Sequence, residues 1–195
     1  MSTRPAAVIV LVGVLAFLAQ GVAMPEQTLL IDDFADRDGR SALGTEWRGF
    51  TDRVMGGRSD MEVGYVDGPE GPALRLRGQV RLDNNGGFIQ ARLPLSADGD
   101  FAADDFAGVA IRARGAPGPY YLHLRTGDTR RPWQYYRAPI DVSDQWQDQV
   151  IPFSAFEARS IRRPLDLGAL RSLAVVAYGE AFEADIEVAR IELVR

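Results

Sequence analysis

Residues 73–77 read Ala-Leu-Arg-Leu-Arg, so that leucines and arginines alternate along this stretch of the chain. Successive side chains of a β-strand point to opposite faces, and the alternation therefore predicts a strand with one buried and one solvated face. Residues 111–114 (Ile-Arg-Ala-Arg) and 122–125 (Leu-His-Leu-Arg) repeat the pattern. The three segments favour antiparallel sheets over helices.

Short apolar runs of this kind continue along the chain, separated by Gly, Pro, Asn and Asp. Strands are expected at residues 28–33, 61–66, 73–78, 87–93, 108–114, 120–126, 133–140, 147–152, 172–178 and 182–193. Single helical turns are expected only at 152–156 and 166–170. The pattern predicts an all-β fold, namely a single antiparallel β-sandwich of jelly-roll type that occupies residues 24–195 as one domain.

The first 23 residues have the layout of a secretory signal peptide. Arg4 supplies the basic start, residues 6–19 are almost wholly apolar, and Gly21 and Ala23 are small residues before a cleavage site. We expect export to the periplasm. The alternative is an uncleaved N-terminal anchor, which would tether the protein to the membrane. No other membrane span is expected.

The composition removes most catalytic groups. The chain of 195 residues has a net charge of −5, no cysteine and a single histidine, His123, and all 22 of its basic residues are arginine. Thiolate chemistry, Cys-ligated metals and a Schiff-base lysine are therefore excluded, and a serine nucleophile would have only His123 as its base. An acidic chain gives no electrostatic reason to bind nucleic acid. We expect a protein that is not an enzyme, that needs no cofactor and that does not bind nucleic acid.

The carboxylates leave two further hypotheses. A glycosidase needs two of them across a cleft, and although Asp52, Asp60, Asp83 and Glu180 are available, nothing in the sequence pairs them. Residues 32–38 hold four acids that could bind Ca²⁺, although a solvated turn explains them equally simply. Both sets are expected to be ordinary acids of loops.

Two glycine doublets, in residues 51–61 (TDRVMGGRSDM) and 83–88 (DNNGGF), predict sharp corners, because glycine accepts positive φ. The polar side chains beside them would satisfy buried backbone groups, while Met55 and Phe88 would tuck beneath the turns. The alternative is a binding rim. The candidate residues are Asp52, Arg53, Met55, Gly56, Gly57, Ser59, Asn84, Asn85, Gly86, Gly87 and Phe88.

Aromatic residues alternate in two predicted strands. Tyr121, His123 and Arg125 share one face of the first strand, and Trp133 and Tyr135, followed by Arg137, share one face of the second. If both rows point outward, they form a patch that could stack on a sugar ring or anchor a protein partner. One row could instead be core. His123 is expected to be a sheet histidine with its hydrogen bonds satisfied.

The residues around both doublets resemble the complex I intermediate-associated protein 30 family. The resemblance rests on residues 52–59, 76–82 and 84–88 with Arg92, and in the second half of the chain on the segments 121–126, 146–156 and 182–193. It implies a galactose-binding-like β-sandwich. Mitochondrial members of the family are assembly factors, and the fold class also includes carbohydrate-binding modules.

Together these features predict a non-enzymatic binding domain. The leading hypothesis is a protein partner in an assembly or chaperone-like role, and the alternative is an exported carbohydrate-binding module that uses Tyr121, Trp133 or Tyr135 for stacking. The partner's identity, any link to complex I and the oligomeric state stay open.

Overall fold

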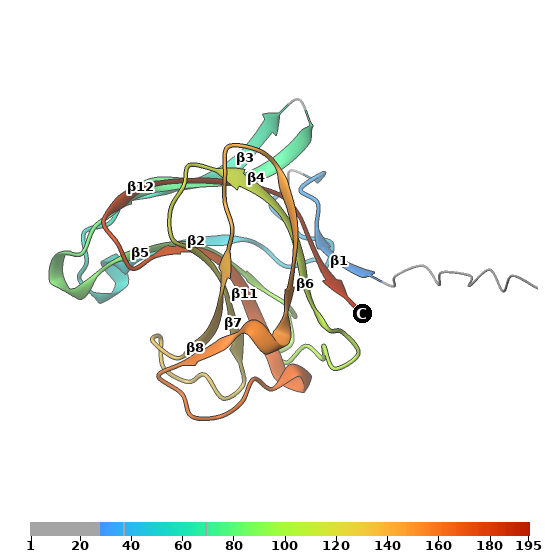
Figure 1. Ribbon diagram of the computed structural model, residues 1–195. Helices are drawn as coiled ribbons and strands as arrows, with labels where there is room; N and C mark the ends of the chain where they lie inside the picture. Colours follow the sequence, from blue (N-terminus) through green and yellow to red (C-terminus); the bar gives the residue numbers. More distant parts are fainter. Residues whose placement is uncertain (1–27, 37, 69) are drawn as a thin grey trace, which may run out of the picture.

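The computed structural model describes residues 28–195 except residues 37 and 69. The expected signal peptide at residues 1–23 lies outside the described residues. The described chain forms two antiparallel sheets that pack face to face as a β-sandwich (Figure 1). Within this part of the chain, none of the helical segments has the length and apolar character needed to cross a lipid bilayer.

The first sheet is built around the long C-terminal strand. Its order is β3 (Glu62–Gly68), β4 (Gly71–Val80), β12 (Phe182–Val194), β6 (Gly108–Gly115) and β9 (Gln147–Pro152), and β1 (Thr28–Asp32) also pairs with β12. Thr28 lies opposite Val194, so β1 and the end of the chain are side by side (Figure 1).

The second sheet carries the candidate site. Its order is β10 (Glu157–Arg159), β8 (Tyr135–Ile140), β7 (Tyr120–Thr126), β11 (Leu170–Tyr178), β5 (Phe88–Pro94) and β2 (Arg48–Thr51). Four 3₁₀ turns complete the described elements: η1 (Asp52–Met55), η2 (Asp83–Asn85), η3 (Phe153–Ala155) and η4 (Leu167–Ala169).

The predicted all-β sandwich is confirmed, and ten of the strands lie within two residues of their predicted bounds at each end. β7 and β9 match over their full length. The short strands β2 and β10 were not predicted, because neither has an apolar residue at every second position. The turns η1 and η2 were also not predicted, and both coincide with the polar residues beside the glycine doublets.

Alternation produces the core. Leu74 and Leu76 of β4 are at most 2% exposed, whereas Arg75 and Arg77, which alternate with them, point away from the second sheet. In β7 the buried residues Leu122 and Leu124 face the core in the same way. Burying a leucine side chain stabilises a fold by about 2 kcal/mol, so these rows fix which face of each sheet is inside.

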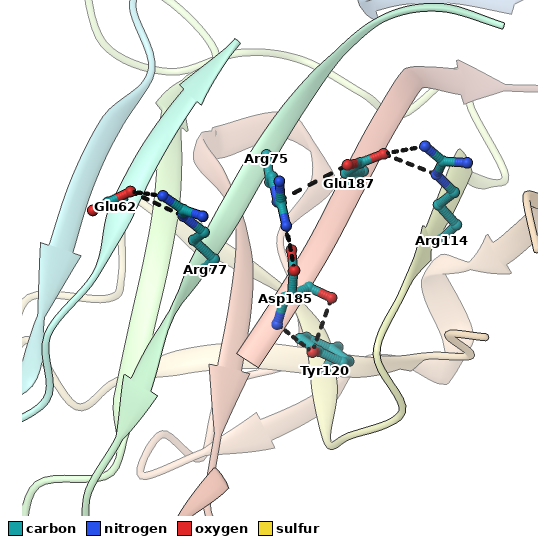
Figure 2. Close-up of polar contacts among 7 residues, drawn as sticks. All are labelled: Glu62, Arg75, Arg77, Arg114, Tyr120, Asp185 and Glu187. Atoms are coloured by element: carbon teal, nitrogen blue, oxygen red, sulfur yellow. Dashed lines mark hydrogen bonds and ion pairs between the residues drawn. The ribbon is translucent and has the colours of Figure 1, made fainter. Parts of the chain in front are cut away.

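The outer face of the first sheet neutralises its own charge. Arg75 of β4 donates to Asp185 of β12 at 2.8 Å, and Arg114 of β6 donates to Glu187 at 2.8 Å (Figure 2). Figure 2 also shows the Tyr120 hydroxyl, which accepts a hydrogen bond from the Asp185 amide at 3.0 Å. Since Tyr120 belongs to β7, this bond ties the two sheets together.

Candidate functional site

The side chain of Asp52 joins the two glycine-rich loops. It is fully buried at the start of η1. Its Oδ2 accepts hydrogen bonds from the Ser59 hydroxyl at 2.6 Å and from the Gly87 amide at 2.7 Å, and its Oδ1 accepts from the Ser59 amide at 2.9 Å. Hydrogen bonds to a charged acceptor are about twice as strong as neutral ones, so this carboxylate holds both loops in place.

Other side chains of the predicted set support the same corner. Arg53 donates from Nε to the Ser59 carbonyl at 2.9 Å, and Asn84 donates from Nδ2 to the Gly56 carbonyl at 3.0 Å. The Ser59 hydroxyl also accepts from the Arg81 amide at 2.9 Å. Asn85 lies at the end of η2. The structure therefore brings the two predicted loops together as one hydrogen-bonded corner.

The geometry explains why each loop has two glycines. Gly56 and Gly87 have positive φ angles of 89° and 125°, in a region that residues other than glycine rarely adopt. Gly57 and Gly86 lie against Asp52: a Cβ on Gly57 would be 2.3 Å from Asp52 Cγ, and one on Gly86 would be 2.3 Å from its Oδ2. In each doublet one glycine makes the turn and the other leaves room for the carboxylate.

The prediction that Met55 tucks beneath the turn is wrong. Met55 is 46% exposed and its neighbour Val54 is 67% exposed, because η1 directs both side chains outward while Asp52 takes the buried position. Phe88 is only partly buried. Met55 and Phe88 both border a hollow on the outer face of the second sheet.

This hollow, which we call the aromatic hollow, has a volume of about 100 Å³. Four elements of the second sheet and the loop before β8 supply its walls. Its principal lining residues are Phe88, Gln90, Arg92, His123, Arg125, Trp133, Tyr135 and Tyr178.

Both predicted aromatic rows lie on this outer face. The rings of His123 and Tyr135 stack with centroids 4.1 Å apart and an interplanar angle of 11°. The guanidinium of Arg137 lies 4.6 Å from the ring centroid of Tyr121. Trp133, from the loop before β8, is 54% exposed at the rim. The inward positions of β7 and β8 are taken by other residues, among them Leu122, Leu124 and Tyr136.

Tyr178 also lines the hollow, but it was not predicted as a site residue from the sequence. It ends β11 and packs edge-on to Tyr121 and Tyr135, with centroid distances of 6.4 Å and 6.5 Å. It follows the apolar run of residues 173–177, which reads as a buried strand and gives no sign of an outward position. The register of β11 against β7 is needed to place it.

His123 differs from its expected state. Its side chain is only 8% exposed, although it belongs to the outer face, and its Nε2 has no hydrogen-bond partner among the described residues. Burial, together with the cations of Arg137, Arg92 and Arg125, lowers its pKa to about 3. The ring is therefore neutral at physiological pH and keeps one polar atom free.

Arg125 positions the rim of the hollow. Its guanidinium donates to the carbonyls of Thr129 at 2.6 Å, Arg131 at 3.0 Å and Pro132 at 3.2 Å. These bonds fix the loop that carries Trp133. Burial lowers the pKa of Arg125, with a contribution from Arg92.

The acids of residues 32–38 and the four carboxylates considered for a glycosidase are not assembled into a metal site. Asp32 accepts from the Phe34 amide at 2.8 Å and from the Trp47 indole at 2.7 Å, which makes it part of a turn. Over the described residues no group of three or more His, Asp or Glu side chains is placed to hold a metal ion. Asp60 and Asp83 are exposed, whereas Asp52 is buried.

Comparison with solved structures shows the fold. The family 11 carbohydrate-binding module of the cellulase Lic26A-Cel5E of Clostridium thermocellum superposes with a TM-score of 0.69 at 16% identity, covering 88% of this chain and 96% of that one. A family 11 module from the same organism, solved in complex with a β-1,3-1,4-mixed-linked tetrasaccharide, gives 0.65 at 16% identity, over 86% and 95% of the two chains. The family 30 module of the cellulase Cel9D-Cel44B gives 0.61 at 14% identity, over 86% and 96%.

No curated protein sequence matches the chain. A family model does match, over residues 34–179, which include both glycine-rich loops, the whole second sheet and most of the first. The match covers well over half of the chain, and the protein therefore belongs to the complex I intermediate-associated protein 30 (CIA30) family.

Proposed function

We propose that the protein is a non-catalytic binding domain whose ligand is a carbohydrate, held on the outer face of the second sheet. The observation that carries the proposal is the aromatic hollow. The stacked pair of His123 and Tyr135 forms its floor with Tyr178, and Trp133 stands exposed at its rim. Aromatic side chains offer large contact areas at low entropic cost, and concave sites with a few polar groups are typical of ligand pockets.

Binding without catalysis agrees with the residues of the hollow. In the described part of the chain, none of the side chains that line it carries a carboxylate. Glycoside hydrolysis requires two such groups on either side of the scissile bond. The nearby carboxylate, Asp52, is fully buried in the corner and its oxygens already accept three hydrogen bonds.

The neighbours in fold space support a sugar as the ligand class. Modules of families 11 and 30 share the sandwich, and one was solved with a bound tetrasaccharide. Identity of 16% or less transfers the fold and not the ligand. The support therefore comes from the combination of this fold with an outward aromatic hollow in the present chain.

The test is calorimetric titration of the protein with a panel of neutral and charged oligosaccharides. We expect at least one member to bind, and we expect Trp133→Ala to weaken that binding roughly tenfold while leaving the melting temperature unchanged, because an exposed ring is lost from the contact alone. Val150→Ala is the matched control, since Val150 is 63% exposed on the first sheet. Binding that Trp133→Ala leaves intact would place the ligand elsewhere, and no binding by any saccharide would refute the proposal.

A protein partner is the second candidate function, and one observation favours it. Val54, Met55 and Leu82 are large apolar side chains that are 46% to 67% exposed, and all three belong to the glycine-rich loops or lie next to them. Exposed apolar residues at one corner are typical of docking surfaces. Pull-down with the purified protein, compared with a Val54→Ser, Leu82→Ser variant, tests this candidate: loss of a captured partner in the variant supports it, and equal capture contradicts it.

We also propose that the chain acts after export, in the periplasm. The basic, apolar and small-residue segments of residues 1–23 support this location. Fractionation of cells expressing the full chain, with mass analysis of the mature N-terminus, tests it. A protein that starts at Met24 in the periplasmic fraction is expected, and an intact chain in the cytoplasm would contradict the proposal.

A further inference from the structure

The arginines of the two sheets differ in their partners. On the first sheet Arg75, Arg77, Arg112 and Arg114 all form ion pairs with neighbouring carboxylates (three of the four are drawn in Figure 2). On the outer face of the second sheet, Arg92, Arg125 and Arg137 have no ion pair with any described carboxylate. A chain that is acidic overall therefore carries uncompensated positive charge at the aromatic hollow.

Arg92 is the member of this set with free donors. The Arg125 guanidinium donates to the backbone of the Trp133 loop, whereas the Arg92 side chain forms no hydrogen bond with a described residue. The Arg92 guanidinium lies over the ring of Phe50, 4.9 Å from its centroid. It is partly buried on the central part of β5, and burial lowers its pKa. A desolvated cation without a counter-charge is costly, and an anionic ligand group would remove that cost.

The positive charge continues beyond the rim of the hollow. Arg130, Arg131, Arg162 and Arg163 border a second depression, the basic groove, whose volume is about 530 Å³. Within the described chain, only Arg163 of these four has an acidic partner, Asp128, at 2.6 Å. Pro132 and Trp133 of the hollow directly follow Arg131 of the groove in sequence, so one loop borders both depressions. A ligand with charges at regular intervals could contact both.

We propose that the ligand is an acidic saccharide, a chain of uronic acid residues, with one carboxylate on Arg92 and further carboxylates over the basic groove. This inference rests on the proposed carbohydrate function. The planar guanidinium fork of Arg92 matches the two oxygens of a carboxylate, and the sugar ring contacts Trp133 and Tyr135. A neutral glucan would fill the same space but would leave Arg92 without a counter-charge.

The probe is tetragalacturonate, compared with its methyl ester, because esterification keeps the sugar rings and removes the charges. Calorimetric titration at low salt is expected to give an affinity for the acid roughly tenfold or more above that for the ester, and added salt should narrow the gap. Arg92→Met is expected to abolish most of this preference. Arg92→Lys, which keeps a charge without the fork, should restore part of it and also guards against a variant that merely misfolds. Arg77→Met, on the first sheet, is the matched control and should leave it unchanged.

The outcomes separate the two proposals. Equal affinity for acid and ester, or binding of neutral oligosaccharides alone, would overturn the acidic ligand and leave carbohydrate binding intact. Absence of binding by every saccharide would refute both. If a single-stranded oligonucleotide binds more tightly than tetragalacturonate, the arginines serve to bind a nucleic acid, and the proposal of a saccharide ligand is wrong.

Discussion

Oδ2 of Asp52 lies 2.7 Å from the amide nitrogen of Gly87, and this hydrogen bond connects two loops that are 35 residues apart in the chain. One loop ends β2 and the other begins β5, so the bond also fixes the corner where the outermost strand meets its neighbour. Met55 and Phe88, which border the aromatic hollow, belong to these two loops. The corner therefore sets one wall of the hollow without itself needing to touch a ligand.

Asp52→Asn tests the corner. The amide places an NH₂ group where a carboxylate oxygen now accepts, so at least one buried donor faces another donor, and we expect the free energy of unfolding to fall by about 2–4 kcal/mol. Urea unfolding measures the change. Asp60→Asn is the control, because Asp60 is exposed and its ion pair with Arg81 is long, at 3.9 Å; it should cost less than about 1 kcal/mol. Similar losses in the two variants would contradict the role of Asp52.

Gly57→Ala tests the space left for that carboxylate. The new methyl group would overlap Asp52 Cγ, so Asp52 must move and lose hydrogen bonds, and we expect destabilisation of about 2–4 kcal/mol. Gly64→Ala is the matched control in β3, where an added Cβ meets nothing within 4 Å, and it should be neutral or stabilising by up to about 1 kcal/mol. A tolerated Gly57→Ala, seen as an unchanged melting temperature, would show that Asp52 is not held as described.

The stability of the protein should depend on pH through His123. Its pKa is about 3 in the folded state and 6.5 in the unfolded state, so only the unfolded chain takes up the proton between these values. The stabilisation that comes from keeping His123 neutral is complete above pH 6.5 and is lost as the pH falls towards 3. The loss by pH 5 is about 2 kcal/mol.

Unfolding of the wild type and of His123→Gln, measured from pH 7 to pH 4, checks this expectation. The difference between the two curves removes the titration of the carboxylates, which both proteins share. The wild type should lose stability more steeply below pH 6.5. Parallel curves would mean that His123 is accessible to protons in the folded protein.

Arg125→Met should loosen the rim without unfolding the sheet. Its three hydrogen bonds to carbonyls hold the loop of residues 129–132, so we expect faster amide hydrogen exchange there and a lower affinity for any ligand that needs Trp133. For the exchange measurement Arg130→Met is the control, because Arg130 is exposed and its side chain forms no hydrogen bond or ion pair with a described residue. Unchanged exchange in Arg125→Met would show that the loop is held by its own backbone.

Local patterns predicted β7 to the residue because every second side chain from Tyr120 to Thr126 is buried in the core. They could not predict β2, whose four residues form a strand only because β5 offers a partner edge from 38 or more residues away in the chain. Local patterns also predicted that the glycines form turns. They did not predict the contact of Gly57 and Gly86 with Asp52, because that contact exists only in the folded corner.

The outer face shows the same limit. Alternation placed His123 outside the core, but its burial comes from Tyr135, which the pairing of β7 with β8 brings over the imidazole. The missing ion pairs of Arg92 follow from where the acids of other strands lie. Such properties depend on the register of the sheet, which cannot be read from local patterns in a single sequence.

The second sheet ends at β2 on one side and β10 on the other, strands of four and three residues. A long, flat outermost strand exposes unpaired backbone groups on which another chain can add a strand, and this is a common route to fibres. Here the outermost strands are short and carry Arg48 on one side and Glu157 and Arg159 on the other. The protein can thus present an aromatic, uncovered sheet to its surroundings while its edges discourage the addition of strands from its own copies.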